Sequence, residues 1–475
     1  NQKMKNYYII ILMALFFSCS GDLEDMNVDV KNATEAPAET FFNNAVKNLS
    51  DTMSGITYGA NGNPFNTTRL LVQQISSVTY NEGTTYYSNF TWNEVYMDIL
   101  NNLRQSEEVI QSAESLTPAN ENQLAIIEIV QVYTWSKLVE SFGNIPYSQA
   151  LDVDNISPEY DDQEAIYTDL IARLTAAISA LDASQPSWGQ DLLYNGDVAS
   201  WSSFGSSLLF QMGMRIIDAN PTLANDAITT ALPNIFTSNA DIAQIEHLES
   251  QPNTAELWTD LAVGNRRDFV GTDVFIDYMN ELEDPRRSVF FQEVDGTDGV
   301  YRGSESGLVV AYFDFSRFGT LFYQPTTPVI LLDYATIEFL LAEAAERGIA
   351  GVTDAESHYN AAIQANFDYY GLGDSAAAYL ANPEVAYTSA PGTWEEKIGM
   401  QKWVALFNQG LEAWTEYRRL DYPTLEAPPQ SFVPTVPVRL TYPISEQTLN
   451  RANYESAAAV IGGDLLTTSL FWDVD

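Results

Sequence analysis

Cysteine and histidine are scarce in this 475-residue chain, and their scarcity argues against several kinds of site. Cys19 is the only cysteine, so no disulfide can form within the chain. His247 and His358 are the only histidines, which disfavours a histidine relay or a histidine-rich metal site. No Walker A, dinucleotide-binding, nucleophile-elbow or HExxH motif occurs. We therefore expect a non-catalytic protein with no cofactor and no metal, although 64 acidic residues leave open a glycosidase-type carboxylate pair.

Basic residues are also few. The chain has 22 Lys and Arg against 64 Asp and Glu, which gives a formal net charge of −42. Such a protein is repelled by nucleic acid, by anionic lipid surfaces and by polyanionic ligands. We therefore expect no nucleic-acid partner and a neutral ligand, with Arg266 and Arg267 near Trp258 as the one candidate cationic spot.

Long hydrophobic runs are missing, but a short one lies near the start. Lys3 and Lys5 precede 11 apolar or aromatic residues at 7–17, which is too short for a membrane-spanning helix and typical of a bacterial export signal. The run ends at Ser18-Cys19 and resembles a lipobox, in which Cys19 becomes the lipid anchor; a plain secretion signal is the alternative. We predict a signal peptide at 1–18 and a lipidated flexible tether at 19–30, whose acidic residues resemble a signal for display on the outer face of the outer membrane.

Helical periodicity dominates the remaining residues, 31–475, which we predict to form one all-α domain. Apolar faces recur at roughly 39–53, 93–115, 121–142, 162–185, 198–219, 225–232, 334–348 and 359–370, and a further face runs from Met400 to Trp414. Paired helices of this length predict a scaffold of TPR-like hairpins, although no regular 34-residue repeat is present. Between about 237 and 330 the periodicity is lost, which predicts a loop-rich insert of the kind that often carries function.

Several motifs in these helical stretches resemble those of the SusD/RagB family, in the family's order and over nearly the whole chain past the tether. They are IIEIVQVYTWSKLVESFGNIPYSQAL at 126–151, DLLYNGDVASWSSFGSSLLFQMGMRI at 191–216, DPRR at 284–287, QKWVALFNQGLEAWTEYRRLDYPTL at 401–425 and VPVRLTYPISEQTLNRANYESA at 436–457. One departure is Gln211, where the family usually has arginine.

This resemblance implies a TPR scaffold with an irregular ligand-binding face, built by the first helix connection and the central insert. It also implies an outer-membrane surface lipoprotein that captures oligosaccharides and delivers them to a SusC-like TonB-dependent transporter. We expect the motif residues themselves to be structural. Trp403 and Trp414 lie on helical faces, and Arg418 and Arg419 are close enough to pair with Glu412 or Glu416 on the same helix.

Ligand contacts are expected from aromatic residues outside the helical periodicity, because a sugar ring presents a face of C–H groups that stacks on an aromatic ring. The candidate ligand-binding residues are Tyr80, Tyr86, Tyr87, Trp258, Arg267, Tyr301, Phe315 and Tyr323. The segment Asp295-Gly-Thr-Asp-Gly299 faintly resembles a calcium loop, but we expect a solvated turn because the EF-hand spacing is absent.

We therefore predict a surface-exposed, oligosaccharide-binding lipoprotein of the outer membrane. Two alternatives remain open. A buried apolar groove would favour a peptide-capturing protein of the same family, and burial of all the aromatic residues would favour a structural subunit of an outer-membrane complex.

Overall fold

The computed structural model describes residues 36–56, 64–87 and 90–474. The predicted signal peptide, Cys19 and the tether lie outside these residues, so the structure does not test them. Within the described residues, no helix is long and apolar enough to cross a membrane.

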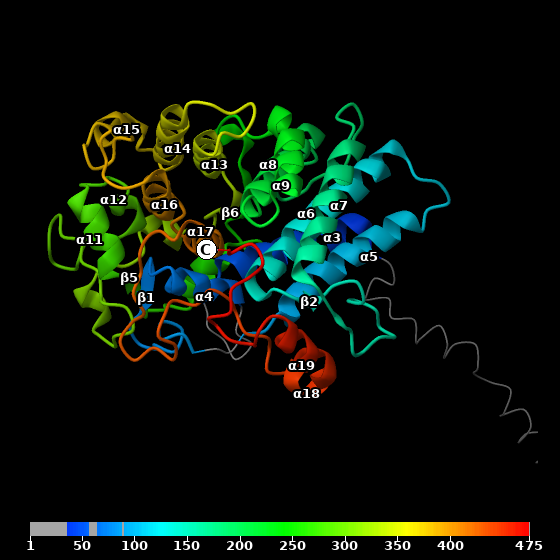
Figure 1. The fold of residues 1–475 in the computed structure, drawn as a ribbon, viewed down its shortest axis with the longest axis horizontal. Helices are drawn as coiled ribbons and strands as arrows, with labels where there is room; N and C mark the ends of the chain where they lie inside the picture. The colour runs from blue at the N-terminus through cyan, green and yellow to red at the C-terminus, as the bar shows by residue number, and fades with distance from the viewer. Residues whose placement is uncertain (1–35, 57–63, 88–89, 475) are drawn as a thin grey trace, which may run out of the picture.

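Pairs of adjacent helices form the scaffold (Figure 1). The pairs are α6 (Pro118–Phe142) with α7 (Gln163–Ala180), α8 (Val198–Arg215) with α9 (Pro221–Ala231), and α13 (Tyr334–Glu346) with α14 (Ala355–Tyr369). Successive pairs also contact one another, since α7 packs on α8 and α8 on α13. The predicted all-α, TPR-like fold is therefore confirmed.

Local sequence signals mark the ends of these helices. The Asp162 carboxylate accepts hydrogen bonds from the backbone N–H groups of Glu164 and Ala165 at the start of α7. A different helix, α6, ends at Gly143, whose φ of +79° is positive and is adopted by glycine without strain.

The predicted helical face from Met400 to Trp414 is divided between two helices, so the expectation of one continuous helix was wrong. The two are α16 (Trp394–Ala405) and α17 (Gly410–Leu420), with Asn408 between them at φ of +65°. Helix α17 begins against α4 (Pro64–Leu71), which the sequence reading did not identify. The Cβ of an alanine at position 410 would lie 2.6 Å from the backbone nitrogen of Arg69, so this contact requires glycine.

The insert at 237–330 is more regular than expected, and its strands pair with segments on either side of it. Strand β5 (Phe269–Gly271) pairs with β1 (Ile75–Ser77), and β4 (Ala243–Ile245) pairs with β6 (Val329–Leu332). A third two-stranded sheet joins β2 (Ile145–Pro146) to β3 (Tyr160–Asp161). The insert also contains α10 (Glu256–Trp258), α11 (Asp273–Glu281) and α12 (Arg287–Phe290).

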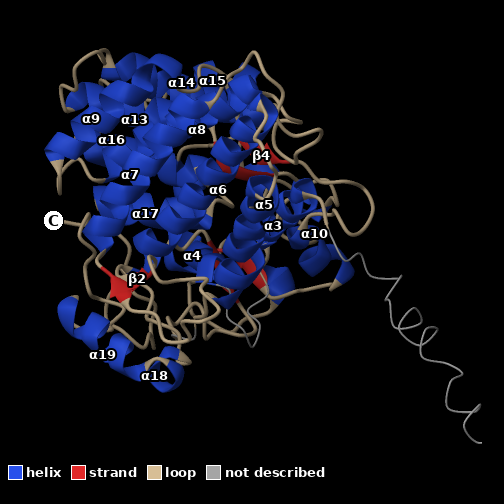
Figure 2. Ribbon diagram, turned by 90° about the vertical axis from the view of Figure 1, so that its right-hand side faces the viewer, coloured by secondary structure: helices blue, strands red, loops and turns tan. Residues whose placement is uncertain are grey.

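Helices near both ends of the chain complete the fold. Helix α3 (Ala38–Ser54) packs on α5 (Asn101–Gln111), and α15 (Gly373–Leu380) packs on α14. Two short helices, α18 (Glu446–Leu449) and α19 (Arg451–Val460), lie near β2 at the lower end of the molecule (Figures 1 and 2). In the orientation of Figure 2, most helices fill the upper and middle parts and loops gather below them.

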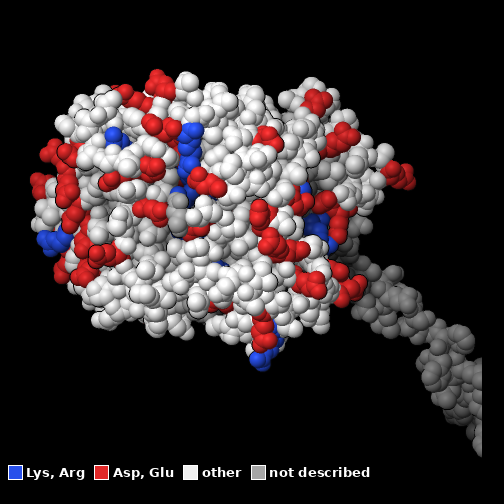
Figure 3. All heavy atoms as spheres, viewed as in Figure 1, with Lys and Arg blue, Asp and Glu red and all other residues white. Residues whose placement is uncertain are grey.

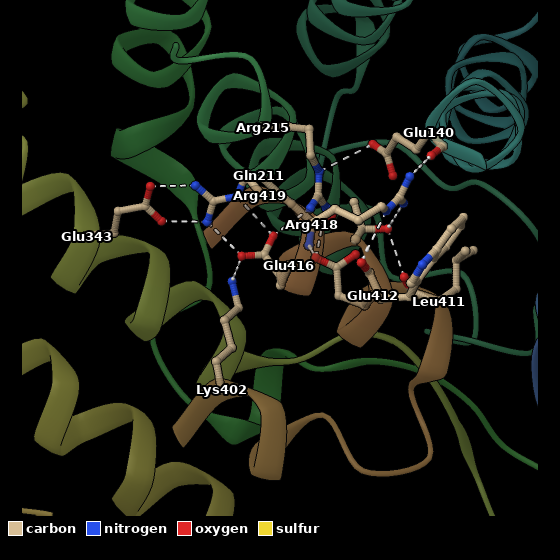
Figure 4. Close-up of polar contacts among 12 residues, drawn as sticks. Glu140, Gln211, Arg215, Glu343, Lys402, Leu411, Glu412, Glu416, Arg418 and Arg419 are labelled. Carbon is tan, nitrogen blue, oxygen red and sulfur yellow. Dashed lines mark hydrogen bonds and ion pairs between the residues drawn. The ribbon is translucent and has the colours of Figure 1, made fainter. Parts of the chain in front are cut away.

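A network of buried charges ties α6, α8, α13, α16 and α17 together (Figure 4). Its ion pairs are Lys137–Glu412 (3.2 Å), Arg215–Glu412 (2.8 Å), Arg215–Glu416 (2.5 Å), Lys402–Glu416 (2.8 Å), Arg419–Glu416 (2.6 Å) and Arg419–Glu343 (2.5 Å). Burial alone raises the pKa of Glu416, but the nearby charges of Arg419, Lys402 and Arg215 lower it well below its ordinary value of 4.5. Glu416 is therefore ionised in the folded protein.

The family-type motif residues belong to this core, as predicted. Trp403 and Trp414 are buried, and Arg419 pairs with Glu416. Arg418 departs from the prediction, because it donates to the backbone carbonyls of Glu140 and Val438 and lies 3.5 Å from the centre of the Trp414 ring. Its role is to link α17 to α6 and to the C-terminal segment.

Candidate functional site

Three loops from distant parts of the sequence meet at one edge of the molecule, below β1 in Figure 1. The amide of Asn81 donates to the carbonyl of Gly307 (3.1 Å), and the backbone N–H of Val310 donates to the carbonyl of Val78 (3.1 Å). The backbone N–H of Phe432 donates to the carbonyl of Thr85 (2.8 Å). These bonds join the loop after β1 to the second half of the insert and to the segment after α17.

The three loops present aromatic side chains to solvent. Tyr80 is 64% exposed, Tyr87 42%, Phe313 44% and Phe432 66%. The Tyr87 and Phe432 rings are in contact, with centroids 5.4 Å apart and planes at 62°. We call the surface formed by these four side chains the aromatic face. Exposed rings are unusual in a protein that buries most of its aromatic residues, and they commonly mark a binding surface.

Arginine side chains border the aromatic face. The guanidinium carbons of Arg267 and Arg317 lie 5.4 and 5.2 Å from the centre of the Phe313 ring, within cation–π range. Arg317 is paired with Asp295, and Arg266 with Asp268 (2.5 Å). Arg267 instead donates to the side-chain oxygen of Asn265 (3.2 Å), so this exposed guanidinium keeps donors directed toward solvent.

The structure corrects one predicted ligand residue, Tyr86. Its side chain is only 2% exposed, and its hydroxyl accepts a hydrogen bond from Gln73 (3.2 Å). Burial raises the pKa of this phenol well above its ordinary value. Tyr86 adopts φ of +64°, and at this turn its ring enters the core while the adjacent Tyr87 lies outside. Tyr86 therefore supports the loop from within and is not accessible to a ligand.

The remaining predicted residues are half-buried and do not form one group. Tyr323 reaches the border of the aromatic face, where its hydroxyl lies 3.3 Å from that of Tyr312. Trp258 is on α10, which packs on α3. Tyr301 lies under the guanidinium of Arg287, 5.4 Å from ring centre to guanidinium carbon. Phe315 directly follows the 3-10 turn Tyr312–Asp314.

The candidate list from the sequence contained neither Phe432 nor Phe313, although Phe313 lies in the predicted insert, and both rings are exposed. A signal for Phe432 was present, since it lies in the non-helical stretch Pro428-Pro429-Gln-Ser-Phe-Val-Pro434, where helical packing gives no reason for a large ring. The contact with Tyr87 joins residues 345 positions apart, and no local pattern reveals such a contact.

Residues 295–299, predicted to be a solvated turn rather than a calcium loop, are exposed, and Asp295 forms an ion pair. The Asp295 carboxylate binds the guanidinium of Arg317, a cation that competes with any metal there. Over the described ranges, no group of three or more Asp, Glu, His or Cys residues is arranged to hold a metal ion.

Acidic groups dominate the outer surface, and few basic groups are visible on the face shown in Figure 3. Part of the reason is that eight of the 19 Lys and Arg residues in the described ranges are buried. Basic groups are therefore rare on the described surface, and the arginines at the aromatic face are local exceptions.

A helical-repeat scaffold that presents exposed aromatic rings beside the free donors of Arg267 has the features of a ligand-binding protein. The family model described as "Starch-binding associating with outer membrane" matches residues 30–443. The chain therefore belongs to the SusD-like family of outer-membrane-associated glycan-binding proteins. These are binding proteins, and the prediction of a non-catalytic protein is confirmed at the level of the family.

Solved structures agree with this assignment. A chitin-binding protein is 25% identical, with a TM-score of 0.80 over 92% of this chain and 100% of its own. A chitin-binding SusD homologue from Flavobacterium johnsoniae is 24% identical, with a TM-score of 0.77 over 91% of this chain and 99% of its own. A SusD homologue from Bacteroides uniformis is 23% identical, with a TM-score of 0.77 over 92% of this chain and 99% of its own. No curated protein matches the sequence.

Proposed function

We propose that this protein captures a neutral oligosaccharide on the aromatic face and delivers it to a SusC-like TonB-dependent transporter. The observation that carries the proposal is the convergence of Tyr80, Tyr87, Phe313 and Phe432 from three separate loops. Rings held this way can stack on the C–H faces of successive sugars, while Arg267 donates hydrogen bonds to their oxygens. The chitin-binding descriptions of two similar structures support a glycan ligand.

The acidic surface favours a neutral glycan over a uronate-rich or sulfated one, because the charge of −42 repels anions. Of the alternatives, a purely structural role is disfavoured by the exposure of Tyr80 and Phe432. Peptide capture would call for an apolar groove. The pocket beside Tyr133 and Phe407 measures only about 40 Å³, which leaves room for a few water molecules.

The binding test uses purified protein and isothermal titration calorimetry against linear malto-, chito-, β-gluco- and fructo-oligosaccharides. We expect binding without cleavage, nearly unchanged between low and high salt. Replacing Tyr80 or Tyr87 by alanine should weaken binding by about 1–3 kcal/mol, the range for losing an aromatic anchor.

Trp394→Ala serves as the control, because Trp394 lies on α16 beside Arg347, and its affinity should equal that of the unaltered protein. Tight binding of alginate or sulfated chains that weakens steeply with salt would contradict a neutral ligand. Equal binding by the Tyr80 and Tyr87 variants would remove the aromatic face from the proposal.

We further propose that Cys19 carries the lipid anchor and that the folded domain lies on the extracellular face of the outer membrane. The apolar run at 7–17, the position of the single cysteine and the acidic residues after it support this arrangement.

A further inference from the structure

A polar hollow lies beside the aromatic face, on the other side of Arg317. It has a volume of about 380 Å³, within the range of small-molecule sites. Its walls come from the end of α12, the turn that follows it and the segment around Thr320. They include the polar side chains of Gln292, Glu293, Asp295, Tyr301 and Arg317.

One side chain joins the hollow to the aromatic face. The Arg317 guanidinium pairs with Asp295 in the wall of the hollow and lies over the rings of Phe313 (5.2 Å) and Tyr312 (5.6 Å). A ligand that touches Phe313 is therefore within about one side chain of the hollow.

The backbone holds the hollow open. The N–H of Gln292 donates to the carbonyl of Arg317 (2.8 Å), and its side-chain amide donates to the carbonyl of Phe318 (2.8 Å). The turn is closed by the N–H of Val294, which donates to the carbonyl of Val300 (2.9 Å). Such bonds between distant residues preform the cavity and lower the entropic cost of binding.

The chemistry of the hollow suits hydroxyl groups. Arg317 is the only cation in its wall and is engaged by Asp295, so the two carboxylates of Glu293 and Asp295 leave the site net acidic. The Glu293 side chain is half-exposed, and in the described part of the chain no side chain or backbone group donates to it, so it is free to accept hydrogen bonds. Tyr301, also half-exposed, adds a ring on which a sugar can stack.

We infer that the hollow is a second sugar subsite, which takes a neutral, hydroxyl-rich branch of a glycan whose main chain lies on the aromatic face. The inference rests on the proposed function and specifies its substrate class as a branched neutral glycan. The position of the hollow supports a branch, because it lies beside the rings proposed to carry the main chain, and Arg317 borders both.

The test compares linear and branched oligosaccharides with the same backbone: maltohexaose with and without a 6-linked glucosyl branch, and cellotetraose with and without xylosyl branches. Isothermal titration calorimetry on the unaltered protein should show that the branched member of at least one pair binds roughly ten-fold more tightly, as expected for a hydrogen bond to a carboxylate. Glu293→Ala should abolish this advantage and leave binding of the linear member unchanged. Tyr87→Ala should weaken both members.

The possible failures are distinguishable. If linear oligosaccharides bind and branches give no advantage in either pair, or if the advantage survives in Glu293→Ala, the subsite is overturned and the aromatic face stands. If no member of either pair binds and the linear panel above also fails, the proposed function and the subsite fail together.

Discussion

Glu416 shows how much of the core depends on one carboxylate. It contacts three basic residues, Arg215 on α8, Lys402 on α16 and Arg419 on its own helix α17 (Figure 4). Arg215 and Arg419 have further carboxylate partners in Glu412 and Glu343, but Glu416 is the only carboxylate paired with Lys402 in the described part of the chain. Burial lowers the pKa of Lys402, which reflects the cost of holding this ammonium group away from water.

Glu416→Gln should therefore destabilise the protein by about 3–5 kcal/mol, because it leaves a buried ammonium group without its counter-charge. Urea denaturation at pH 7 measures the change in the free energy of unfolding. The control is Glu455→Gln on α19, which removes an exposed ion pair with Arg451 and should have no measurable effect. Equal stability of the two variants would show that the network contributes little.

We also predict how the stability of the unaltered protein and of Glu416→Gln depends on pH. The pKa of Glu416 in the folded protein lies below its ordinary value of 4.5, so protonation favours the unfolded state. Its contribution to stability is present above that value and is lost as the pH falls through the folded pKa. The unaltered protein should lose more stability on acidification than Glu416→Gln does.

At the scale of elements, the contact of α4 with α17 determines where the last long helix begins. Gly410 approaches the backbone of Arg69 so closely that a Cβ would lie 2.4 Å from the Cγ of that arginine and 3.0 Å from its Cα. The Arg69 side chain is itself fixed by donating to the carbonyls of Met53 and Ser54. There is little room for either element to move.

Gly410→Ala should thus lower the free energy of unfolding by about 1–3 kcal/mol through overpacking. Gly189→Ala is the control, since its Cβ would meet only the Glu39 carboxylate at an ordinary contact distance of 3.5 Å. Thermal unfolding followed by circular dichroism compares the two. A Gly410→Ala protein as stable as the control would mean that the α4–α17 contact adapts freely.

These contacts also explain which features could be predicted from the sequence. The helices around α6, α7 and α14 were predictable because apolar periodicity and capping residues such as Asp162 act within a few positions. The break before Gly410 was not predictable, because the backbone of Arg69, far away in sequence, packs against it. The inward turn of Tyr86 was not predictable either, because its hydroxyl is bonded to Gln73, whose side-chain amide also lies 2.6 Å from the distant carbonyl of Glu426. Two of the three loops that carry the aromatic face lie in stretches that the sequence reading had marked as non-helical, whereas the exposure of individual rings depends on how the loops pack.

At the scale of the whole molecule, the folded domain and the predicted anchor lie in different parts of the chain. In our proposal, lipid-modified Cys19 attaches the protein to the membrane, and the described residues begin at 36. A lipid-modified cysteine of this kind carries more than one acyl chain, which is enough for stable anchoring.

Cys19→Ala should accordingly release the protein from the membrane fraction, while binding to any glycan ligand is unchanged. Fractionation of cells, with mass spectrometry of the N-terminal peptide, checks both location and lipid mass. A chain that retains residues 4–18, or that stays in the membrane with alanine at 19, would contradict the anchor.

The burial of basic residues has a consequence for proteolysis. Of the 19 Lys and Arg residues in the described ranges, only Arg267, Arg302 and Arg451 are well exposed. A protease that cleaves after basic residues therefore has few accessible sites on the folded domain, and two of the three lie in the insert. The ion pairs that hold the helices together thereby also shield most of the potential cleavage sites from trypsin-like enzymes for as long as the protein stays folded.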